Sequence, residues 1–268
     1  MGRYLRLFGA FARIGLATEM AFRVNFLMKM LVEALWLAIL LVFYDVLFRN
    51  MGGGSVAGWD RWSYLFFVGC HYALSGVVET FFLENCTKLA ELVRSGELDQ
   101  YLLKPIDEQF LITTKQMDWS TFPNILQGIG VMLFALAMMD WPVTLGQTLA
   151  FLLLFTCGVA MAYSFLLVLC SCSVWMVRNQ SLVEMWWLFT TLMRYPRELF
   201  VGYYVSPIGM FFSYIVPVLL IINVPAATMV RGLQPGFAAL AVAAAVILLL
   251  FSRWVFRRAL QSYRSASS

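Results

Sequence analysis

The sequence predicts an all-α integral membrane protein, and two observations carry that prediction. Of its residues, 62% are hydrophobic and 13% are charged, whereas a soluble globular domain has roughly 45–50% apolar and about 25% charged residues. The excess of apolar surface cannot be buried in a water-soluble core of 268 residues. Apolar segments also follow one another along the chain without a polar linker, so we expect one membrane domain over residues 1–268.

The N-terminal segment, residues 1–22, is expected to form an interfacial amphipathic helix. Arg3, Arg6 and Arg13 alternate with large apolar residues between positions 3 and 16. A basic polar face opposite an apolar face is typical of a helix that lies on the membrane surface. The same arginines interrupt the apolar core that a cleavable signal peptide needs.

Five segments approach or exceed the length of roughly 20 apolar residues that a membrane-spanning helix needs. They cover residues 26–48, 63–83, 122–139, 147–176 and 236–256. The stretch 181–229 holds two further apolar runs, separated by the polar interval from Arg194 to Glu198. These segments give a count of six or seven crossings.

The placement of basic residues favours six crossings, because cytoplasmic segments carry an excess of Lys and Arg. With the N-terminus inside and residues 194–235 outside, the inner segments hold thirteen of the 19 basic residues and the outer segments five, while Lys29 lies within the first helix. A seventh crossing would place the basic C-terminal segment outside. We therefore expect six transmembrane helices with both termini in the cytoplasm.

Six crossings require one of the two late apolar runs to enter the membrane without crossing it. Five of the eight prolines lie in or just after this region, namely Pro196, Pro207, Pro217, Pro225 and Pro235. Proline interrupts a helix, and irregular backbone at membrane depth is tolerated only where protein or a wet cavity covers it. We expect a fifth span over 181–203, kinked near Pro196. A re-entrant helical pair at about 207–229 should follow, within an extracytoplasmic segment over 204–235.

The segment 84–119 is the one sizeable polar stretch, and it is expected on the cytoplasmic side. Leu89, Leu92 and Val93 have helical spacing, Gly96 interrupts the pattern, and a second apolar run ends at Pro105. This pattern predicts two short amphipathic helices hinged at Ser95-Gly96. They would lie on the membrane surface or dock a soluble partner.

Several functional classes lack their motifs. The run Gly52-Gly53-Gly54-Ser55 has no Gly-Lys-Ser/Thr ending, so it is not a phosphate-binding loop. A single histidine and scattered cysteines do not have the spacing of metal ligands. His71 and Ser75 share one helical turn, which cannot supply the geometry of a serine hydrolase. We expect no catalytic residues, metal or bound cofactor, and no nucleic-acid partner because the basic residues form no single patch.

Ionisable residues within spans are functional candidates by default. Lys29 and Glu33 are four residues apart, so they can pair with each other; the alternative is a substrate or inter-subunit role for Glu33. Glu79 has no cation within one helical turn, which makes it a candidate for an acid that faces a cavity. His71 is expected to pack or to line a pore. Glu33, Glu79 and His71 are therefore the candidates for a substrate pathway.

The most specific run in the chain is Glu91-Leu-Val-Arg-Ser-Gly-Glu-Leu-Asp-Gln-Tyr-Leu-Leu-Lys-Pro-Ile106. It resembles the Arg-x-Gly-Glu-Leu-Asp-x-x-Leu-Leu-x-Pro hallmark that follows the second span in one branch of type-2 ABC exporter permeases. The run Ala21-Phe-Arg-Val-Asn-Phe26 and the late prolines resemble the same branch. The resemblance covers nearly the whole chain.

The resemblance implies that residues near 85–107 form the coupling helix between spans 2 and 3. Its contacts with the ATPase subunit would come from Arg94, Glu97, Asp99 and Lys104, and its anchors on the bundle would be Leu98, Leu102 and Leu103. The alternative is an ordinary cytosolic loop with solvated charges. The resemblance also implies that the re-entrant pair, with Pro207, Pro217 and Pro225, forms an outer gate.

These expectations describe the transmembrane subunit of an ATP-driven exporter in a bacterial-type cytoplasmic membrane, not an enzyme on its own. ATP and Mg²⁺ would bind a separate ABC ATPase chain, and a second permease subunit, identical or homologous, would complete the pathway. The substrate would be amphipathic, lipid-like or drug-like, and would leave the cytoplasm or inner leaflet. The alternatives are an ATP-independent secondary transporter or channel subunit, an intramembrane enzyme, and an assembly or scaffold subunit. A secondary transporter would predict broken helices in both halves, whereas the prolines cluster in the second half.

Overall fold

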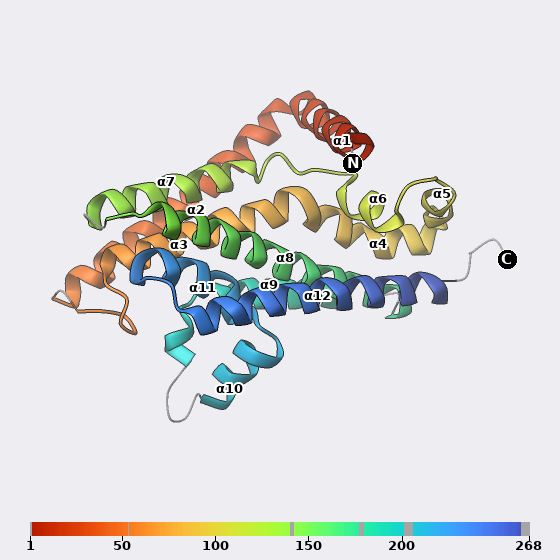
Figure 1. Cartoon of the computed structure of the whole chain (residues 1–268). Coiled ribbons are helices and arrows are strands. Elements are labelled where there is room, and N and C mark those ends of the chain that lie inside the picture. The colour runs from red at the N-terminus through yellow and green to blue at the C-terminus, as the bar shows by residue number, and fades with distance from the viewer. Residues whose placement is uncertain (1, 53, 140–141, 177–179, 201–205, 264–268) are drawn as a thin grey trace.

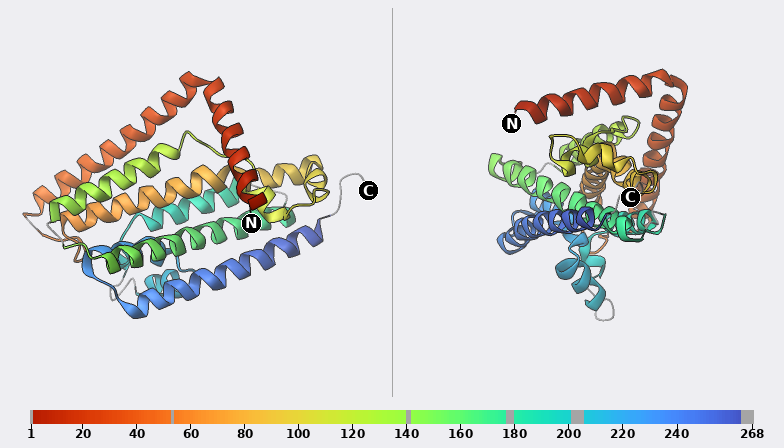
Figure 2. Two further views of the ribbon diagram at one scale, coloured as in Figure 1. Left: turned by 45° about the horizontal axis from the view of Figure 1, so that its top comes forward. Right: turned by 90° about the vertical axis from the view of Figure 1, so that its right-hand side faces the viewer.

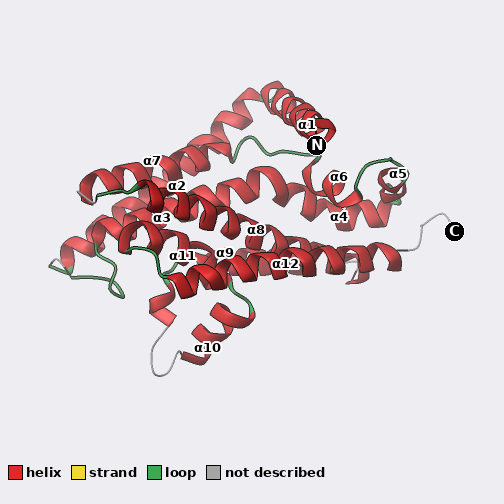
Figure 3. Cartoon of the chain, viewed as in Figure 1, coloured by secondary structure: helices red, strands yellow, loops and turns green. Residues whose placement is uncertain are grey.

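The computed structural model confirms the all-α prediction: the described residues form helices joined by short loops, with no strand among them (Figures 1 and 3). The structure describes residues 2–52, 54–139, 142–176, 180–200 and 206–263. Five helical stretches are long and apolar enough to cross a membrane, and a sixth is added if one bent helical pair counts as a single span. They are α2 (Arg23–Asn50), α3 (Arg61–Val78) with its extension to Ser95, α7 (Phe122–Met139), α8 (Leu145–Met176) and α12 (Pro235–Ser262).

The N-terminal helix α1 (Gly2–Ala21) is present as predicted and meets α2 at a sharp corner at Phe22 (Figure 2). None of its residues is buried. It touches the rest of the chain at a few points: the indole Nε1 of Trp119 donates to the Ala12 carbonyl at 3.0 Å, and the rings of Tyr4 and Phe110 lie 4.9 Å apart. Its position on a membrane surface remains a prediction.

The second span is longer than the sequence indicates. We expected a span over 63–83 and a separate amphipathic helix after it, but α3 continues through a π-helical turn, η1 (Glu79–Leu83), into α4 (Glu84–Ser95). Together they form one helix of 35 residues, Arg61–Ser95. The predicted hinge is confirmed, because Gly96 has a φ of 73°, which a residue without a Cβ adopts readily. The short helices α5 (Leu98–Leu102) and α6 (Glu108–Thr114) follow.

The predicted fifth span is wrong in its second half. Helix α9 (Gln180–Met193) has 14 residues, which is about 21 Å at 1.5 Å per residue and short of a bilayer core of roughly 30 Å. A turn that contains Pro196 follows, and then the 3₁₀ helix η2 (Arg197–Phe200). The helix therefore stops before the proline instead of kinking at it, since the residue before a proline is disfavoured in the α region. Residues 201–203 lie outside the described part of the chain.

The bent pair predicted for 207–229 is confirmed as a pair. It consists of α10 (Ser206–Met210) with the π-helical turn η3 (Phe211–Ile215), and of α11 (Val218–Arg231). The two halves meet at an angle of 82°, with Pro217 at the break. Such a bend fits a broken span as well as a re-entrant loop. Helix α11 is buried almost throughout, whereas Pro207 in α10 is exposed.

The bundle is held together by close helix packing at small residues. A Cβ on Gly128 of α7 would lie 2.6 Å from the Gly69 carbonyl oxygen of α3, and a Cβ on Gly158 of α8 would lie 2.6 Å from the Ile221 carbonyl oxygen of α11. Small residues allow such backbone approach in membrane helices, where packing drives association. Helix α2 differs, because only 6% of its most apolar window is buried. The N-terminal end of α1 and the C-terminal end of α12 lie at the same end of the bundle as α4, α5 and α6, here called the terminal end (Figures 1 and 2).

Candidate functional site

A cavity of about 520 Å³, with several polar and charged side chains in a mainly apolar wall, lies between α2, α3 with η1, α7 and α9. It brings together the three residues predicted for a substrate pathway, which come from two different helices. Its wall is formed by Glu33, Trp36, Ile39, Leu40, Phe43, His71, Tyr72, Ser75, Glu79, Asn124, Trp187, Thr190, Thr191 and Arg194. The volume falls in the range of small-molecule pockets.

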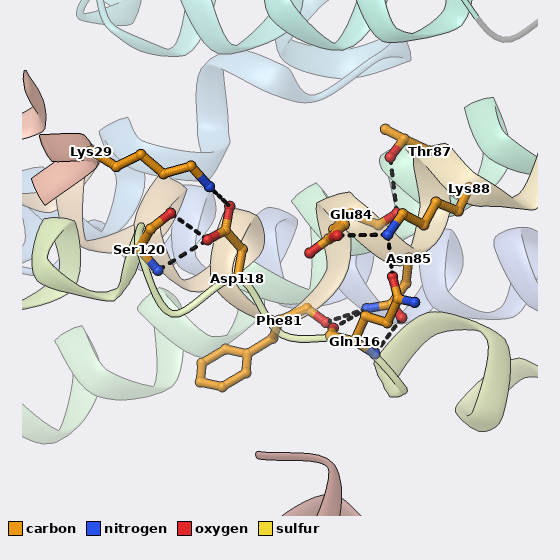
Figure 4. Close-up of polar contacts among 9 residues, drawn as sticks. All are labelled: Lys29, Phe81, Glu84, Asn85, Thr87, Lys88, Gln116, Asp118 and Ser120. Atoms are coloured by element: carbon orange, nitrogen blue, oxygen red, sulfur yellow. Dashed lines mark hydrogen bonds and ion pairs between the residues drawn. The ribbon is translucent and has the colours of Figure 1, made fainter. Parts of the chain in front are cut away.

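Glu33 enters the cavity from α2, and its partner differs from the expected one. The amide Nδ2 of Asn124 on α7 donates to the Glu33 carboxylate at 3.2 Å. Lys29 instead lies 3.9 Å from the carboxylate of Asp118, in the loop before α7 (Figure 4). The predicted Lys29–Glu33 pair is therefore wrong, because Lys29 pairs with Asp118 in the loop before α7 and Glu33 with Asn124 in the first turn of α7.

Glu79 lies at the first position of the π-helical turn η1. A π-helical turn leaves backbone carbonyls without their usual helical donor, and such turns are frequent at functional sites. Two carbonyls of η1 find donors elsewhere: the Asp118 amide donates to the Thr80 carbonyl at 3.0 Å, and the Asn85 side-chain amide donates to the Phe81 carbonyl at 3.2 Å. The turn that positions Glu79 is thus stabilised by the segment before α7.

Asn85 and Gln116 form the strongest part of this attachment (Figure 4). The Asn85 side chain donates to the Gln116 carbonyl and accepts from the Gln116 amide at 2.7 Å, so both backbone groups of one residue are satisfied by one side chain. Lys88 donates to Glu84 at 2.7 Å and also to the Gln116 side chain. Sequence reasoning missed this set, although a buried Asn beside charged residues on one helical face was a usable signal.

Among the described residues, four buried polar atoms of the cavity wall have no hydrogen-bond partner: Nδ1 of His71, Oγ of Ser75, Oδ1 of Asn124 and Nε of Arg194. The His71 side chain is 5% exposed. Arg194 follows α9 directly, and sequence reasoning assigned it to an outer loop. Its side chain instead lines the cavity, because α9 ends before it reaches a full span. Buried polar groups are normally paired, so these atoms indicate that the cavity receives a ligand or water.

The segment predicted to couple to an ATPase divides into exposed charges and a buried anchor. Arg94, Glu97 and Lys104 are exposed, and Asp99 is half-buried. Leu98 is fully buried and Leu102 packs against the core. Leu103 is 85% exposed, so its predicted role as an anchor is wrong: it lies at the end of a short helix with its side chain turned away from the bundle.

A second polar set attaches this segment to the bundle at α8 and α12. Arg253 of α12 donates to Asp107 at 2.7 Å and to Gln109 at 3.2 Å. Gln109 in turn donates to the hydroxyl of Tyr163 on α8 at 2.9 Å. Partial burial acts to raise the pKa of Asp107, but the hydrogen bonds from Arg253 and from the Phe110 amide outweigh it and hold that pKa below its ordinary value.

At the end of the bundle opposite the termini, the Glu198 carboxylate binds three donors. Trp59 Nε1 donates at 3.0 Å, Asn223 Nδ2 at 2.8 Å and Arg231 at 3.2 Å. The Arg231 guanidinium also lies 3.9 Å from the centre of the Trp59 ring. Glu198 thus connects η2, the loop before α3, and both the middle and the C-terminal end of α11. We call these four residues the Glu198 cluster.

The predicted gate prolines lie in the bent pair, where Pro217 directly precedes α11 and Pro225 is buried inside it. Whether they form a gate stays a prediction. Among the described residues, no group of three or more His, Cys, Asp or Glu side chains is arranged to hold a metal ion.

A comparison with protein-family models matches residues 34–267 to the family described as ABC-2 family transporter protein. The match begins within α2, one residue after Glu33, and covers all of the later spans. It includes every residue of the cavity wall except Glu33, together with the exposed charged segment and the bent pair. No curated protein and no solved structure matches the chain.

Proposed function

The chain belongs to the ABC-2 family of transporter proteins, and from this premise we propose that it is the transmembrane subunit of an ATP-driven exporter of amphipathic, lipid-like or drug-like compounds. Membership makes the chain a membrane component of a transporter that is not itself catalytic. ATP and Mg²⁺ would bind a separate ATPase chain. A second permease subunit, identical or homologous, would complete the pathway, and both termini would face the cytoplasm.

The observation that carries this proposal is the continuous helix from Arg61 to Ser95. Its middle holds His71 and Glu79 in the cavity wall, and its end holds the exposed Arg94, three residues before the exposed Glu97. A force applied to the charged end therefore reaches the cavity through one helix. This is the connection that an ATP-driven transporter needs between its partner and its substrate site.

In the proposed mechanism, the partner ATPase docks on Arg94, Glu97, Lys104 and the exposed Leu103. ATP shifts the permease between inward-open and outward-open forms only to the extent that the ATPase binds one form better. Leu98 would transmit the movement, because it is the buried contact of α5. The set formed by Arg253 with Asp107 and Gln109 would distribute it to α12.

The Glu198 cluster and the bent pair would form the outer gate. Three donors on one carboxylate hold η2 and α11 to the loop before α3 in the form described here. Hydrogen bonds to a charged group contribute roughly 1.5–3 kcal/mol each where they are shielded from water. A set of this kind stabilises one form while remaining breakable when the bundle changes shape.

The proposal is tested by purifying the tagged chain from its native membrane in mild detergent and identifying the proteins that accompany it by mass spectrometry. The expected result is a stoichiometric ATPase with a phosphate-binding loop, with or without a second permease. Recovery of the chain alone, or as a bare oligomer after cross-linking in the membrane, would contradict ATP coupling. The leading interpretation would then be an ATP-independent transporter or channel subunit.

A further inference from the structure

We propose that the cavity binds a zwitterionic amphiphile, whose cationic group lies against Glu33 and Glu79 and whose anionic group lies against Arg194. This deepens the proposed function, on which it rests for the assumption that the cavity holds the substrate. The inference comes from the charges on the walls and from the polar atoms that the chain leaves unpaired.

The first wall is acidic and is built from two elements. Glu33 comes from α2 and Glu79 from η1, and Asn124 donates to Glu33 at 3.2 Å. Among the described residues, neither carboxylate has an ion-pair partner, since the cations nearest in sequence pair elsewhere: Lys29 with Asp118 and Lys88 with Glu84. Two carboxylates inside a helical bundle attract a cation, because the charged forms are costly without one.

The part of the cavity wall that follows α9 is basic. Arg194 follows α9, and its buried Nε lacks a partner. A guanidinium keeps its charge in proteins and offers a planar set of donors that suits a carboxylate or phosphate. In the part of the chain that the structure describes, no carboxylate lies within ion-pair distance of it. The cavity thus separates its two signs of charge instead of pairing them.

A ligand with one sign of charge would match only one wall. A simple cation would leave Arg194 unmatched, and a simple anion would face two carboxylates; an unpaired charge away from water is unfavourable in both cases. A zwitterion matches both walls. The neutral polar residues of the cavity wall also suit a zwitterionic ligand, because His71 and Ser75 have buried polar atoms without a hydrogen-bond partner. Trp36 and Trp187 lie in the cavity wall and are 62% and 49% exposed, which gives an apolar or cationic part of a ligand an aromatic surface.

The test uses three soluble probes with the same six-carbon tail: hexylphosphocholine, hexyltrimethylammonium and hexyl phosphate. Their binding to the purified permease in phosphatidylglycerol nanodiscs is measured by calorimetry and by saturation-transfer NMR. The expected result is that hexylphosphocholine binds about tenfold more tightly than either singly charged probe, which corresponds to roughly 1.4 kcal/mol. Equal binding of the three probes, binding of the cation as tight as that of the zwitterion, or no binding would overturn the proposal.

Two variants test which charged group of the probe each part of the cavity wall binds. Glu79→Gln should reduce the affinity for hexylphosphocholine toward that for hexyl phosphate, whereas Arg194→Gln should reduce it toward that for hexyltrimethylammonium. Glu108→Gln and Arg13→Gln make the same chemical changes at exposed positions and should leave the ranking unchanged. Helical content and a monodisperse elution profile show that each variant is folded. An unchanged ranking in both cavity variants would contradict the assignment.

The zwitterionic ligand could be the headgroup of a bilayer lipid or a soluble compound. Binding measured in nanodiscs of a second lipid composition distinguishes the two. In phosphatidylcholine discs a resident headgroup would compete, so the probe would lose affinity if a lipid is the occupant and keep it if a soluble zwitterion is. Binding is measured without an ATPase, so its failure is distinct from failure of ATP coupling. If the cavity prefers the zwitterionic probe but no ATPase co-purifies, the proposed ligand class is supported and the proposed ATP-driven export is contradicted.

Discussion

Gly128→Ala should destabilise the bundle, because α7 approaches α3 most closely at this residue. The new Cβ would come closest to the backbone nitrogen of Ala73, and would lie 2.6 Å from the Gly69 carbonyl oxygen and 2.8 Å from the Cα of Ala73. The Gly69 oxygen would have to retreat by about 0.8 Å, from 2.6 Å to the 3.4 Å at which ordinary contact begins, and the Ala73 nitrogen would have to retreat further. Because these atoms are backbone, no rotamer change relieves the overlap.

The expected cost follows from the general penalty for overpacking, which is about 1–3 kcal/mol. On the scale of soluble proteins of this size, each kcal/mol lowers the melting temperature by roughly 2–4 °C, so Gly128→Ala should lower it by roughly 2–12 °C. The assay is thermal unfolding of the purified chain in one detergent, followed by circular dichroism at one scan rate.

Gly130→Ala provides the matched control. Gly130 lies two residues further along α7 and is exposed, and a Cβ there would meet nothing within 4 Å. Alanine is the better helix former by about 1 kcal/mol, so this variant should be as stable as the parent or slightly more stable. If the two variants melt at the same temperature, the close contact between α3 and α7 is not present in the protein, and the positions inferred for Asn124 and Glu79 lose their support.

Three further predictions follow from single contacts. Leu98→Ala should cost about 2–5 kcal/mol, as for other fully buried leucines, and should weaken ATPase capture, whereas Leu103→Ala should weaken capture with no change in melting temperature. Glu198→Gln should increase the rate of proteolysis within η2 (Arg197–Phe200), because one amide oxygen cannot serve three donors. Because the pKa of Asp107 is lowered in the folded protein, its carboxylate stabilises the fold above about pH 4, and this contribution is lost as the pH falls further. Asp107→Asn should therefore remove this part of the pH dependence of thermal unfolding.

Much of the architecture could be predicted from the sequence because it depends on local rules. The lengths of the apolar segments predict the long spans, the missing Cβ of Gly96 predicts the hinge there, and the prolines predict the bent pair around Pro217. The segment 84–119 was also recognised as polar and partly helical. The exception is its junction with the second span, where the helix continues without a break because nothing in the local sequence marks a π-helical turn.

The rest depends on contacts between segments that are far apart in the chain. The π-helical turn at Glu79 is stabilised by Asp118, 39 positions later in the sequence, and no periodicity records that. Lys29 has Glu33 one turn away but is closer to the loop before α7. Arg194 lies two residues before Pro196, in a polar interval that indicates an outer loop, yet the early end of α9 brings it into the cavity. Leu103 has the hydropathy of an anchor, but the end of a five-residue helix leaves it exposed.

The central claim is that the helix from Arg61 to Ser95 connects an ATPase to the cavity, and one measurement tests it most directly. ATP turnover is compared between the isolated partner ATPase and its complex with the permease, using the unmodified chain, Glu97→Lys and Glu108→Lys. The two substitutions make the same change of charge, and both glutamates are exposed. We predict that the unmodified chain and Glu108→Lys change turnover several-fold, and that Glu97→Lys returns it to the value of the isolated ATPase while hexylphosphocholine binding is retained. Turnover with Glu97→Lys equal to that of the unmodified complex would contradict the account.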